Sequence, residues 1–211
     1  LLDQVSEKIN IFVIHNREST LHDLPEAIKN HEKLDSIKFY EFKDNNHYFP
    51  NIPGSHISVA TYYRLFIENY LSEDIDEIAY LDADTICIRD PIQPLSKEFS
   101  ILAQSKNVIS ATTEIIKSEI EEKRIHEYIM PWDRLGVKER YFNAGVLLIS
   151  FSQWKKLKYS EKLINGLRAL KEDIIYWDQD ILNSVVNGNY CELDKKFNLS
   201  NDNISRGKVE G

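Results

Sequence analysis

Two acidic residues in the order Asp-Ala-Asp, Asp82 and Asp84, directly follow a compact apolar run at residues 77–81. In an extended chain, side chains two residues apart point to the same face, so the two carboxylates are expected to serve one site. Carboxylate oxygens suit Mg²⁺ or Mn²⁺, whose octahedral shells are commonly completed by water and substrate phosphates. Acids that follow a buried strand also cap turns, so the pair alone leaves both interpretations open.

Three further polar positions carry groups that could bind a substrate. Asp178, Gln179 and Asp180 lie together at the apparent start of an apolar helix, where a simple N-cap explains one of them. The guanidinium of Arg64 can bind oxygens as a fork, although a salt bridge between helices is the alternative. The amide of Asn143 can both donate and accept hydrogen bonds, or it can cap a turn.

Short apolar strands and helical patterns alternate along the chain and would position these groups. Strands are expected at residues 9–14, 36–42, 77–81, 86–88, 108–111 and 145–149. Helices are expected at residues 58–71, 155–170 and 179–186, with another starting near Asp23 and Pro25 and a charged surface helix at 117–124. This alternation predicts an α/β fold with a central, largely parallel or mixed sheet. Such sheets bind ligands at the carboxyl ends of strands, where Asp82 lies.

The composition is that of one globular domain spanning residues 1–211, with 42% hydrophobic and 28% charged residues. A net charge of -8 argues against a nucleic-acid partner. No apolar run approaches the ~20 residues that span a bilayer, and two cysteines are too few for a disulfide framework, so we expect a cytoplasmic protein. The chain starts at Leu1 without Met and ends at Gly211, which indicates part of a larger polypeptide.

An Asp-x-Asp after an apolar strand also occurs in haloacid-dehalogenase-like phosphatases, whose first Asp is a nucleophile. Their pattern is Asp-x-Asp-x-Thr, whereas here Thr85 follows Asp84 directly and Ile86 stands at the expected Thr position. The later Gly-Asp with an acidic cluster is also missing from the sequence. The phosphatase is therefore the less favoured alternative.

Four separated segments resemble the retaining glycosyltransferases of family 8, which include bacterial lipooligosaccharide galactosyl- and glucosyltransferases and glycogenin. They are residues 56–65, 78–90, 141–149 and 177–183, and their order and spacing also match. The resemblance implies a GT-A fold, a UDP-hexose donor, and Mn²⁺ or Mg²⁺ as cofactor. It further implies retention at the anomeric carbon and a carbohydrate or glycoconjugate acceptor, such as a bacterial surface polysaccharide or protein-linked glycan.

The resemblance also assigns roles to individual residues. Those expected to bind the donor are Arg64, Asp82, Ala83, Asp84, Asn143, Ala144, Asp178 and Gln179. Asp82 and Asp84 would hold the metal, while Gln179 would lie across the anomeric carbon and act in catalysis with Asp178. His56 and Glu114 would face the acceptor. Because Gln is a poor nucleophile compared with a carboxylate, we favour same-face attack assisted by the leaving phosphate.

The resemblance exposes gaps at both ends of the chain. In the family, an earlier strand and loop contact the uracil and ribose, and a later His-x-x-Gly-x-x-Lys-Pro motif binds metal and diphosphate. Neither occurs between Leu1 and Gly211, so this stretch alone is expected to bind metal and donor weakly without turnover. The alternative function is a catalytically silent nucleotide-sugar-binding module. A C-terminal segment beyond Gly211 would also give any peripheral contact with the inner face of the membrane.

Overall fold

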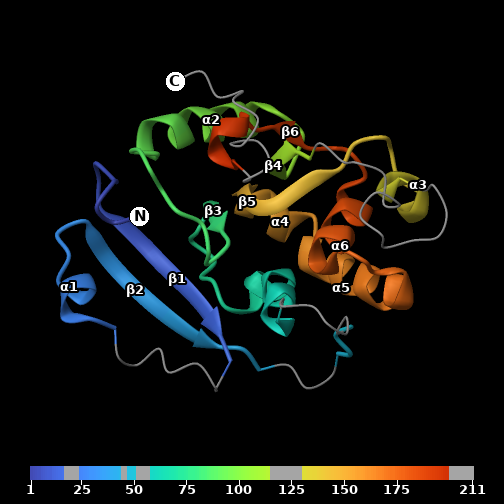
Figure 1. The fold of residues 1–211 in the computed structure, drawn as a ribbon, viewed down its shortest axis with the longest axis horizontal. Coiled ribbons are helices and arrows are strands. Elements are labelled where there is room, and N and C mark those ends of the chain that lie inside the picture. The colour runs from blue at the N-terminus through green and yellow to red at the C-terminus, as the bar shows by residue number, and fades with distance from the viewer. Residues whose placement is uncertain (17–23, 44–46, 51–57, 115–129, 200–211) are drawn as a thin grey trace.

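The computed structural model of the protein describes residues 1–16, 24–43, 47–50, 58–114 and 130–199 (Figure 1). Its strands are β1 (Ile9–His15), β2 (Leu34–Glu41), β3 (Glu77–Leu81), β4 (Ile109–Thr113), β5 (Phe142–Ser150) and β6 (Cys191–Glu192). Its helices are α1 (Glu26–Lys29), α2 (Ile92–Gln104), α3 (Pro131–Leu135), α4 (Phe151–Lys156), α5 (Tyr159–Leu170) and α6 (Trp177–Val186). Three 3₁₀ helices are η2 (Val59–Asn69), η3 (Lys171–Asp173) and η4 (Lys195–Phe197). No helix in these ranges has the length and apolar character needed to cross a bilayer.

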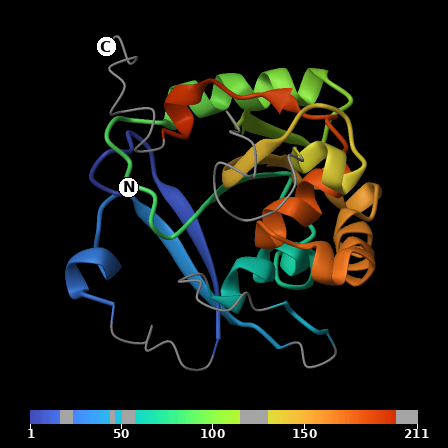
Figure 2. The same ribbon diagram turned by 45° about the vertical axis from the view of Figure 1, so that its right-hand side comes forward.

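The strands form a four-stranded sheet in the order β3-β5-β4-β6 and a separate pair, β1 and β2, visible to one side in Figure 2. β5 runs antiparallel to β3 and β4, whereas β4 and β6 are parallel, as are β1 and β2. The predicted α/β class with a mixed sheet is therefore confirmed. Since Leu81 pairs with Val146, the end of β3 lies beside the first half of β5.

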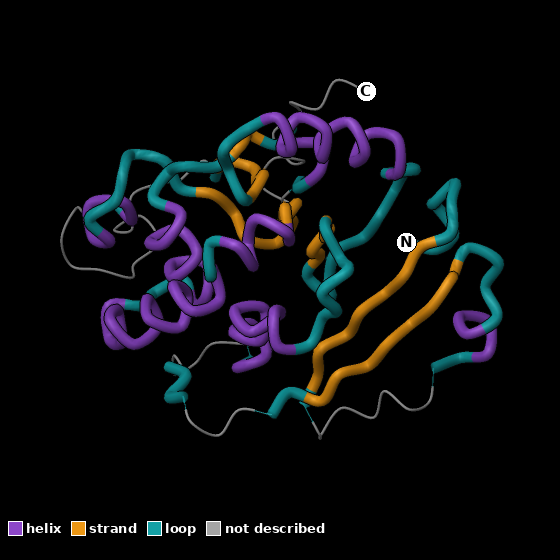
Figure 3. Tube along the Cα trace, turned by 180° about the vertical axis from the view of Figure 1, so that it is seen from behind, coloured by secondary structure: helices purple, strands orange, loops and turns teal. Residues whose placement is uncertain are grey.

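Helices cover both faces of the four-stranded sheet (Figure 3). Leu147 and Ile149 of β5 join the main core, and Val146 and Leu148 pack in a second cluster with Leu102 of α2. A strand buried on both faces reads as a continuous apolar run, which is why β5 is predictable from sequence. This burial holds β5 rigidly, and β5 carries part of the candidate site.

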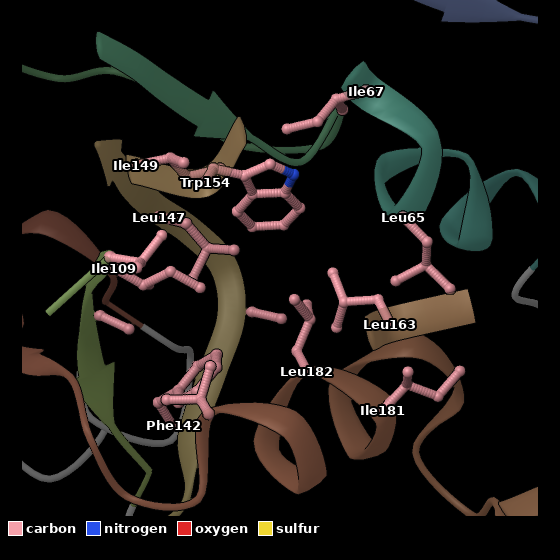
Figure 4. Close-up of a cluster of buried hydrophobic side chains, with 14 of the residues drawn as sticks. Leu65, Ile67, Ile109, Phe142, Leu147, Ile149, Trp154, Leu163, Ile181 and Leu182 are labelled. Atoms are coloured by element: carbon pink, nitrogen blue, oxygen red, sulfur yellow. The ribbon is translucent and has the colours of Figure 1, made fainter. Parts of the chain in front are cut away.

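The main core lies between β5 and the helices α4, α5 and α6 (Figure 4). Its fully buried side chains include Trp154 of α4, Leu163 of α5 and Ile181 and Leu182 of α6. Each large apolar side chain buried in this way stabilises the fold by about 1.5–3 kcal/mol. The start of α6, which carries two predicted site residues, Asp178 and Gln179, is thereby anchored against the sheet.

The helix predicted at residues 58–71 is η2, a 3₁₀ helix that carries Arg64 among its buried residues. Ser58 caps it by accepting a hydrogen bond from the backbone N–H of Ala60 at 3.3 Å. With three residues per turn, Thr61, Arg64 and Ile67 follow one line along the helix. The structure buries Arg64 to 7% exposure. Its charge is tolerated there because carboxylates from elsewhere in the fold pair with it.

Two predicted elements differ in the structure. Residues 86–88 form no strand, and Ile86 and Ile88 are 83% and 70% exposed, because no neighbouring chain in the described ranges pairs with them. The helix predicted at 155–170 is two helices, since Lys158 adopts a left-handed backbone conformation with φ of 54° between α4 and α5. Such a conformation cannot continue an α-helix.

Two predicted helices lie wholly or partly outside the described residues. α1 begins at Glu26 with Pro25 in the N-cap position, and Asp23 lies outside the described residues. The predicted surface helix at 117–124 also lies outside them.

Candidate active site

The two acids of the Asp-Ala-Asp motif lie in a turn rather than in an extended strand. β3 ends at Leu81, and the N–H of Thr85 donates to the carbonyl of Asp82 at 3.0 Å, which closes the turn. The prediction that strand geometry aligns the two side chains was therefore wrong. The N–H of Asp82 still donates to the carbonyl of Gly145 at 2.8 Å, so its backbone stays fixed to β5. Asp84 is exposed, and no described residue forms a hydrogen bond or ion pair with it.

Arg64 joins three elements of the site from its position on η2. Its Nη2 donates to Oδ1 of Asp82 at 2.7 Å, and its Nη1 donates to the carbonyl of Ala144 in β5 at 2.5 Å. Its Nε lies 2.7 Å from Oδ2 of Asp178 at the start of α6. The guanidinium also stacks 4.0 Å from the ring centroid of Tyr80, whose hydroxyl donates to the same Asp82 oxygen at 2.9 Å. One buried cation therefore holds the acidic turn, β5 and α6 together.

The charges of this cluster are set by burial and by each other. Burial lowers the pKa of Arg64, whereas the nearby carboxylates of Asp178 and Asp82 raise it. The raising effects are together the larger, so the pKa of Arg64 lies above its ordinary value. Burial also raises the pKa of the Tyr80 hydroxyl, which therefore remains a neutral hydrogen-bond donor. The guanidinium stays protonated and pairs with two carboxylates.

Asp178 is deeply buried, with 3% exposure. Its Oδ1 accepts a hydrogen bond from the hydroxyl of Thr61. Its Oδ2 faces Arg64 electrostatically, but no described residue aims a hydrogen-bond donor at it. Burial raises the pKa of Asp178, while the charge of Arg64 and the Thr61 hydroxyl lower it. The ionised form of Asp178 thus depends on Arg64.

A second cluster links the amides of Gln179 and Asn143 through one carboxylate. Oε1 of Gln179 accepts from the N–H of Ala144 at 2.9 Å, and its Nε2 donates to Oε2 of Glu114 at 3.1 Å. Nδ2 of Asn143 donates to the same Glu114 oxygen at 3.3 Å. Because Ala144 also offers its carbonyl to Arg64, the two clusters meet at one residue of β5.

Gly145 gives the acidic turn and Asn143 room to approach each other. A Cβ atom at this position would lie 3.1 Å from Oδ1 of Asn143 and 3.2 Å from Oδ2 of Asp82. Oδ1 of Asn143 accepts from the N–H of Gly145 at 2.8 Å and from Nδ2 of Asn198 at 2.7 Å. The side chains of two candidate residues, Asp82 and Asn143, and that of Asn198 therefore converge over a backbone position that has no side chain.

The carboxylate oxygens of Asp82 and Asp84 are the type of ligand that a hard divalent cation prefers. Oδ1 of Asp82 is engaged by Arg64 and Tyr80, but Oδ2 accepts no hydrogen bond within the described part of the chain, and Asp84 is exposed. No group of three or more His, Cys, Asp and Glu side chains in the described ranges is placed to hold a metal. Two carboxylates can serve Mg²⁺ or Mn²⁺ when water and phosphate complete the shell.

The second acid of the α6 motif, Asp180, has a structural role. It is fully buried, and its carboxylate accepts hydrogen bonds from Arg134, from the hydroxyl of Tyr141 and from the backbone N–H groups of Ile175 and Tyr176. These contacts hold the chain that enters α6 and so orient the two residues before Asp180. The alternative that one of the three polar residues of this motif is the N-cap is not met, because Tyr176 is the N-cap of α6 and has no capping side-chain hydrogen bond.

The predicted residues have different outcomes in the structure. Those brought together are Arg64, Asp82, Asn143, Ala144, Asp178, Gln179 and Glu114. Ala83 lies exposed in the turn beside Asp84, and His56 lies outside the described residues. Glu114, predicted to face the acceptor, accepts hydrogen bonds from the side-chain amides of Asn143 and Gln179.

Four residues of the site were missed by sequence reasoning. They are Thr61, Tyr80, Gly145 and Asn198. The first three lie inside segments that the sequence analysis singled out, so their position was a usable signal. Asn198 lies outside all four segments, and nothing in its sequence context indicates its contact with Asn143.

Comparison with known proteins gives matches over most of the chain. The sequence model of Glycosyl transferase family 8 matches residues 3–208. The chain is 28% identical over 167 residues to General stress protein A of Bacillus subtilis, covering 77% of the chain and 52% of that relative. It is 35% identical over 143 residues to Lipopolysaccharide 1,3-galactosyltransferase of Salmonella typhimurium, covering 66% of the chain and 39% of that relative. The chain thus spans about half or less of the length of these curated relatives.

A solved structure is also similar over nearly the whole chain. It is the galactosyltransferase LgtC in complex with donor and acceptor sugar analogs, with a TM-score of 0.71 and 26% sequence identity. The match covers 97% of the chain and 69% of that structure.

Proposed function

The chain belongs to glycosyltransferase family 8, and on this basis we propose that the full-length protein transfers a hexose, glucose or galactose, from a UDP-sugar to a carbohydrate or glycoconjugate acceptor. The predicted family and GT-A fold are confirmed by the match over residues 3–208 and by the likeness to LgtC. The proposal rests mainly on two hydrogen bonds of Ala144. Its carbonyl accepts from Arg64, and its N–H donates to Oε1 of Gln179. This residue brings the acidic turn and the α6 motif to one place.

Asp82 and Asp84 are the proposed ligands of Mn²⁺ or Mg²⁺. Such an ion, when bound, stabilises the negative charge that develops on a leaving diphosphate. Arg64 places a second, fixed positive charge beside Asp82, in a position to bind phosphate or sugar oxygens as a fork. The remaining metal ligands would come from water, from the donor and from chain outside the described residues.

Gln179 is proposed to act as an oriented dipole at the donor sugar rather than as a nucleophile. An amide oxygen is a poor nucleophile compared with a carboxylate, and Oε1 of Gln179 already accepts the N–H of Ala144. Its position therefore supports attack by the acceptor on the same face as the leaving diphosphate. This route retains the anomeric configuration without a glycosyl-enzyme intermediate.

Asp178 is proposed to bind a donor hydroxyl in exchange for the hydroxyl of Thr61. The Thr61 contact shows that Oδ1 of Asp178 accepts a hydroxyl in this geometry. Because Arg64 compensates its charge, Asp178 can remain ionised while it is buried. An ionised acceptor forms stronger hydrogen bonds with sugar hydroxyls than a neutral one does.

The acceptor class is proposed from the relatives. The Salmonella typhimurium relative is named a lipopolysaccharide galactosyltransferase, which supports a bacterial surface polysaccharide as the acceptor. Synthesis of such a glycan from UDP-sugars is consistent with a cytoplasmic protein that works near the membrane surface.

A donor screen tests the proposed function. The full-length protein is incubated with each UDP-sugar with and without Mn²⁺, and UDP release and transfer are measured. We expect release from UDP-glucose or UDP-galactose only when the metal is present. Failure to bind or hydrolyse any UDP-hexose would refute the proposal. Calorimetric binding of UDP that depends on metal, without hydrolysis or transfer, would instead support a silent nucleotide-sugar-binding module.

Replacing Gly145 with Ala is expected to lower kcat/KM by about 10- to 100-fold while the protein stays folded. The φ angle of Gly145 lies outside the left-handed region, so Ala is compatible with the backbone. The new Cβ displaces the carboxylate of Asp82 and the amide of Asn143 by tenths of an ångström. UDP-release kinetics and thermal unfolding check this result.

Gly166→Ala is the matched control for this variant. A Cβ at Gly166 would lie 3.3 Å from Val185 and 3.4 Å from Ile181, which is similar crowding between α5 and α6. The next neighbour is the hydroxyl of Ser184 at 3.6 Å, and none of the three side chains belongs to the candidate site, so we expect nearly unchanged kinetics. Equal losses of activity in both variants would contradict a special role for Gly145.

A further inference from the structure

One oxygen of Glu114 accepts hydrogen bonds from two amides that lie on different elements. Oε2 accepts from Nε2 of Gln179 at the start of α6 and from Nδ2 of Asn143 in β5. The backbone of Glu114 is itself fixed, because its N–H donates to the carbonyl of Tyr141 at 2.9 Å. The carboxylate is therefore held at the end of β4, between the two amides.

The hydrogen-bond partners determine how each amide is turned. The oxygens of Gln179 and Asn143 accept backbone N–H groups of Ala144 and Gly145, which only an acceptor atom can do. Their NH₂ groups must then point away from β5, and both reach the carboxylate of Glu114. An ionised carboxylate accepts but cannot donate, so it favours this orientation of both amides. Without it, each NH₂ group loses the bond that Glu114 provides.

We propose that Glu114 is a positioning residue that holds Gln179 and Asn143 in the orientation needed at the donor sugar, rather than a residue that binds the acceptor. The inference rests on the proposed function, in which these two amides contact the donor. It assigns Glu114 an effect on every reaction of the donor, including its reaction with water.

The test compares donor hydrolysis with acceptor binding in Glu114→Ala. Hydrolysis of the UDP-hexose is followed as UDP release without acceptor, and the acceptor KM is measured separately. Positioning predicts that the rate of hydrolysis falls about 10-fold while the acceptor KM changes little. An acceptor-binding role predicts the opposite pattern, with unchanged hydrolysis and a raised acceptor KM, and that pattern would overturn the proposal.

Two further variants separate positioning from general structural damage. Glu114→Gln keeps an acceptor oxygen at the same place, so it is expected to restore hydrolysis to within about 3-fold of the original protein. Glu192→Ala removes another carboxylate beside β4, one that accepts the N–H of Thr113 at 3.0 Å but contacts neither amide. It should leave hydrolysis unchanged. A loss as large as that in Glu114→Ala would overturn the proposal.

A measurement without substrate keeps the inference separate from the proposed function. In the ligand-free protein, the side-chain ¹⁵N amide resonances of Gln179 and Asn143 are expected to shift in Glu114→Ala and to exchange faster with water. In Glu192→Ala they should stay as they are. Unchanged resonances in Glu114→Ala would overturn the positioning role. If no UDP-hexose is a substrate, the proposed function fails, and these resonances still decide whether Glu114 orients the amides.

Discussion

Replacing Asp84 with Ala is expected to lower metal-dependent kcat/KM by about 10²- to 10³-fold without destabilising the fold. Asp84 is exposed and has no hydrogen bond or ion pair with the described part of the chain, so folding loses no contact there. A catalytic metal supplies several kcal/mol of charge stabilisation in the transition state, and each ~1.4 kcal/mol is tenfold in rate. Mn²⁺ affinity and UDP-release kinetics check the loss of metal-dependent activity, and urea unfolding checks that stability is unchanged.

The same replacement at Asp82 should give the same kinetic defect with an added loss of stability. Asp82 is 37% exposed and accepts hydrogen bonds from Arg64 and Tyr80. Because Arg64 keeps its ion pair with Asp178, we expect the free energy of unfolding to fall by only about 1 kcal/mol. The difference between the variants separates the ligand role of Asp82 from its structural role.

Glu77→Ala is the matched control for both variants. Glu77 is an exposed acid at the opposite end of β3, so its removal changes the net charge equally without touching the proposed metal site. We expect its response to Mn²⁺ to match that of the original protein. Unchanged metal dependence in both Asp variants would refute the assignment of Asp82 and Asp84 as ligands.

The parts of the fold that the sequence predicts are those in which local pattern and burial agree. The apolar run of β5 is buried on both faces, so its residue types alone indicate a central strand. The acidic motif after β3 is likewise recognisable, since an apolar run ends there in two carboxylates. Residues 86–88 have a similar apolar pattern but form no strand, and Ile86 and Ile88 are exposed, because strand formation also needs a neighbouring chain to pair with.

The contacts of the site were less predictable because they join residues distant in sequence. Nothing in the helical pattern of residues 58–71 shows that Arg64 meets Asp82, Asp178 and the carbonyl of Ala144. The same holds for Glu114, whose partners lie on β5 and α6. Residue types identify groups capable of chemistry, but only the packed elements decide whether a group meets the substrate or another side chain.

Replacing Arg64 with Ala is expected to lower the free energy of unfolding by about 3–5 kcal/mol and to abolish transfer. The substitution leaves the buried carboxylate of Asp178 without its counter-charge. Removing one partner of a buried ion pair lowers the free energy of unfolding by about 3–5 kcal/mol. Arg64→Lys keeps the charge, but a single ammonium cannot reach Asp82, Asp178 and the Ala144 carbonyl at once. We therefore expect Arg64→Lys to be more stable than Arg64→Ala and still severely impaired in UDP release.

Arg140→Ala is a close control for Arg64→Ala. Arg140 also binds a carboxylate, that of Glu192 at 3.1 Å, a backbone carbonyl, that of Gly188 at 3.0 Å, and a tyrosine ring, that of Tyr190 at 4.0 Å. Its side chain is 39% exposed, so water replaces these contacts when it is removed. The expected loss is about 1 kcal/mol or less, with activity retained. Comparable losses in the two variants would show that burial of Arg64 has no special energetic weight.

The stability deficit of Arg64→Ala should shrink as the pH falls, because Asp178 can then accept a proton. Burial already raises the pKa of Asp178 above its ordinary value, and loss of Arg64 removes the charge that opposes this shift. A carboxyl group whose pKa is higher in the folded state binds more protons when folded. Its contribution to stability is therefore fully present below the ordinary Asp pKa of about 3.9 and is lost as the pH rises through the folded pKa. The deficit is measured by urea unfolding of the original protein and of Arg64→Ala at pH values from below the ordinary Asp pKa upwards. A deficit independent of pH would contradict the assignment of Asp178 as the residue that Arg64 keeps ionised.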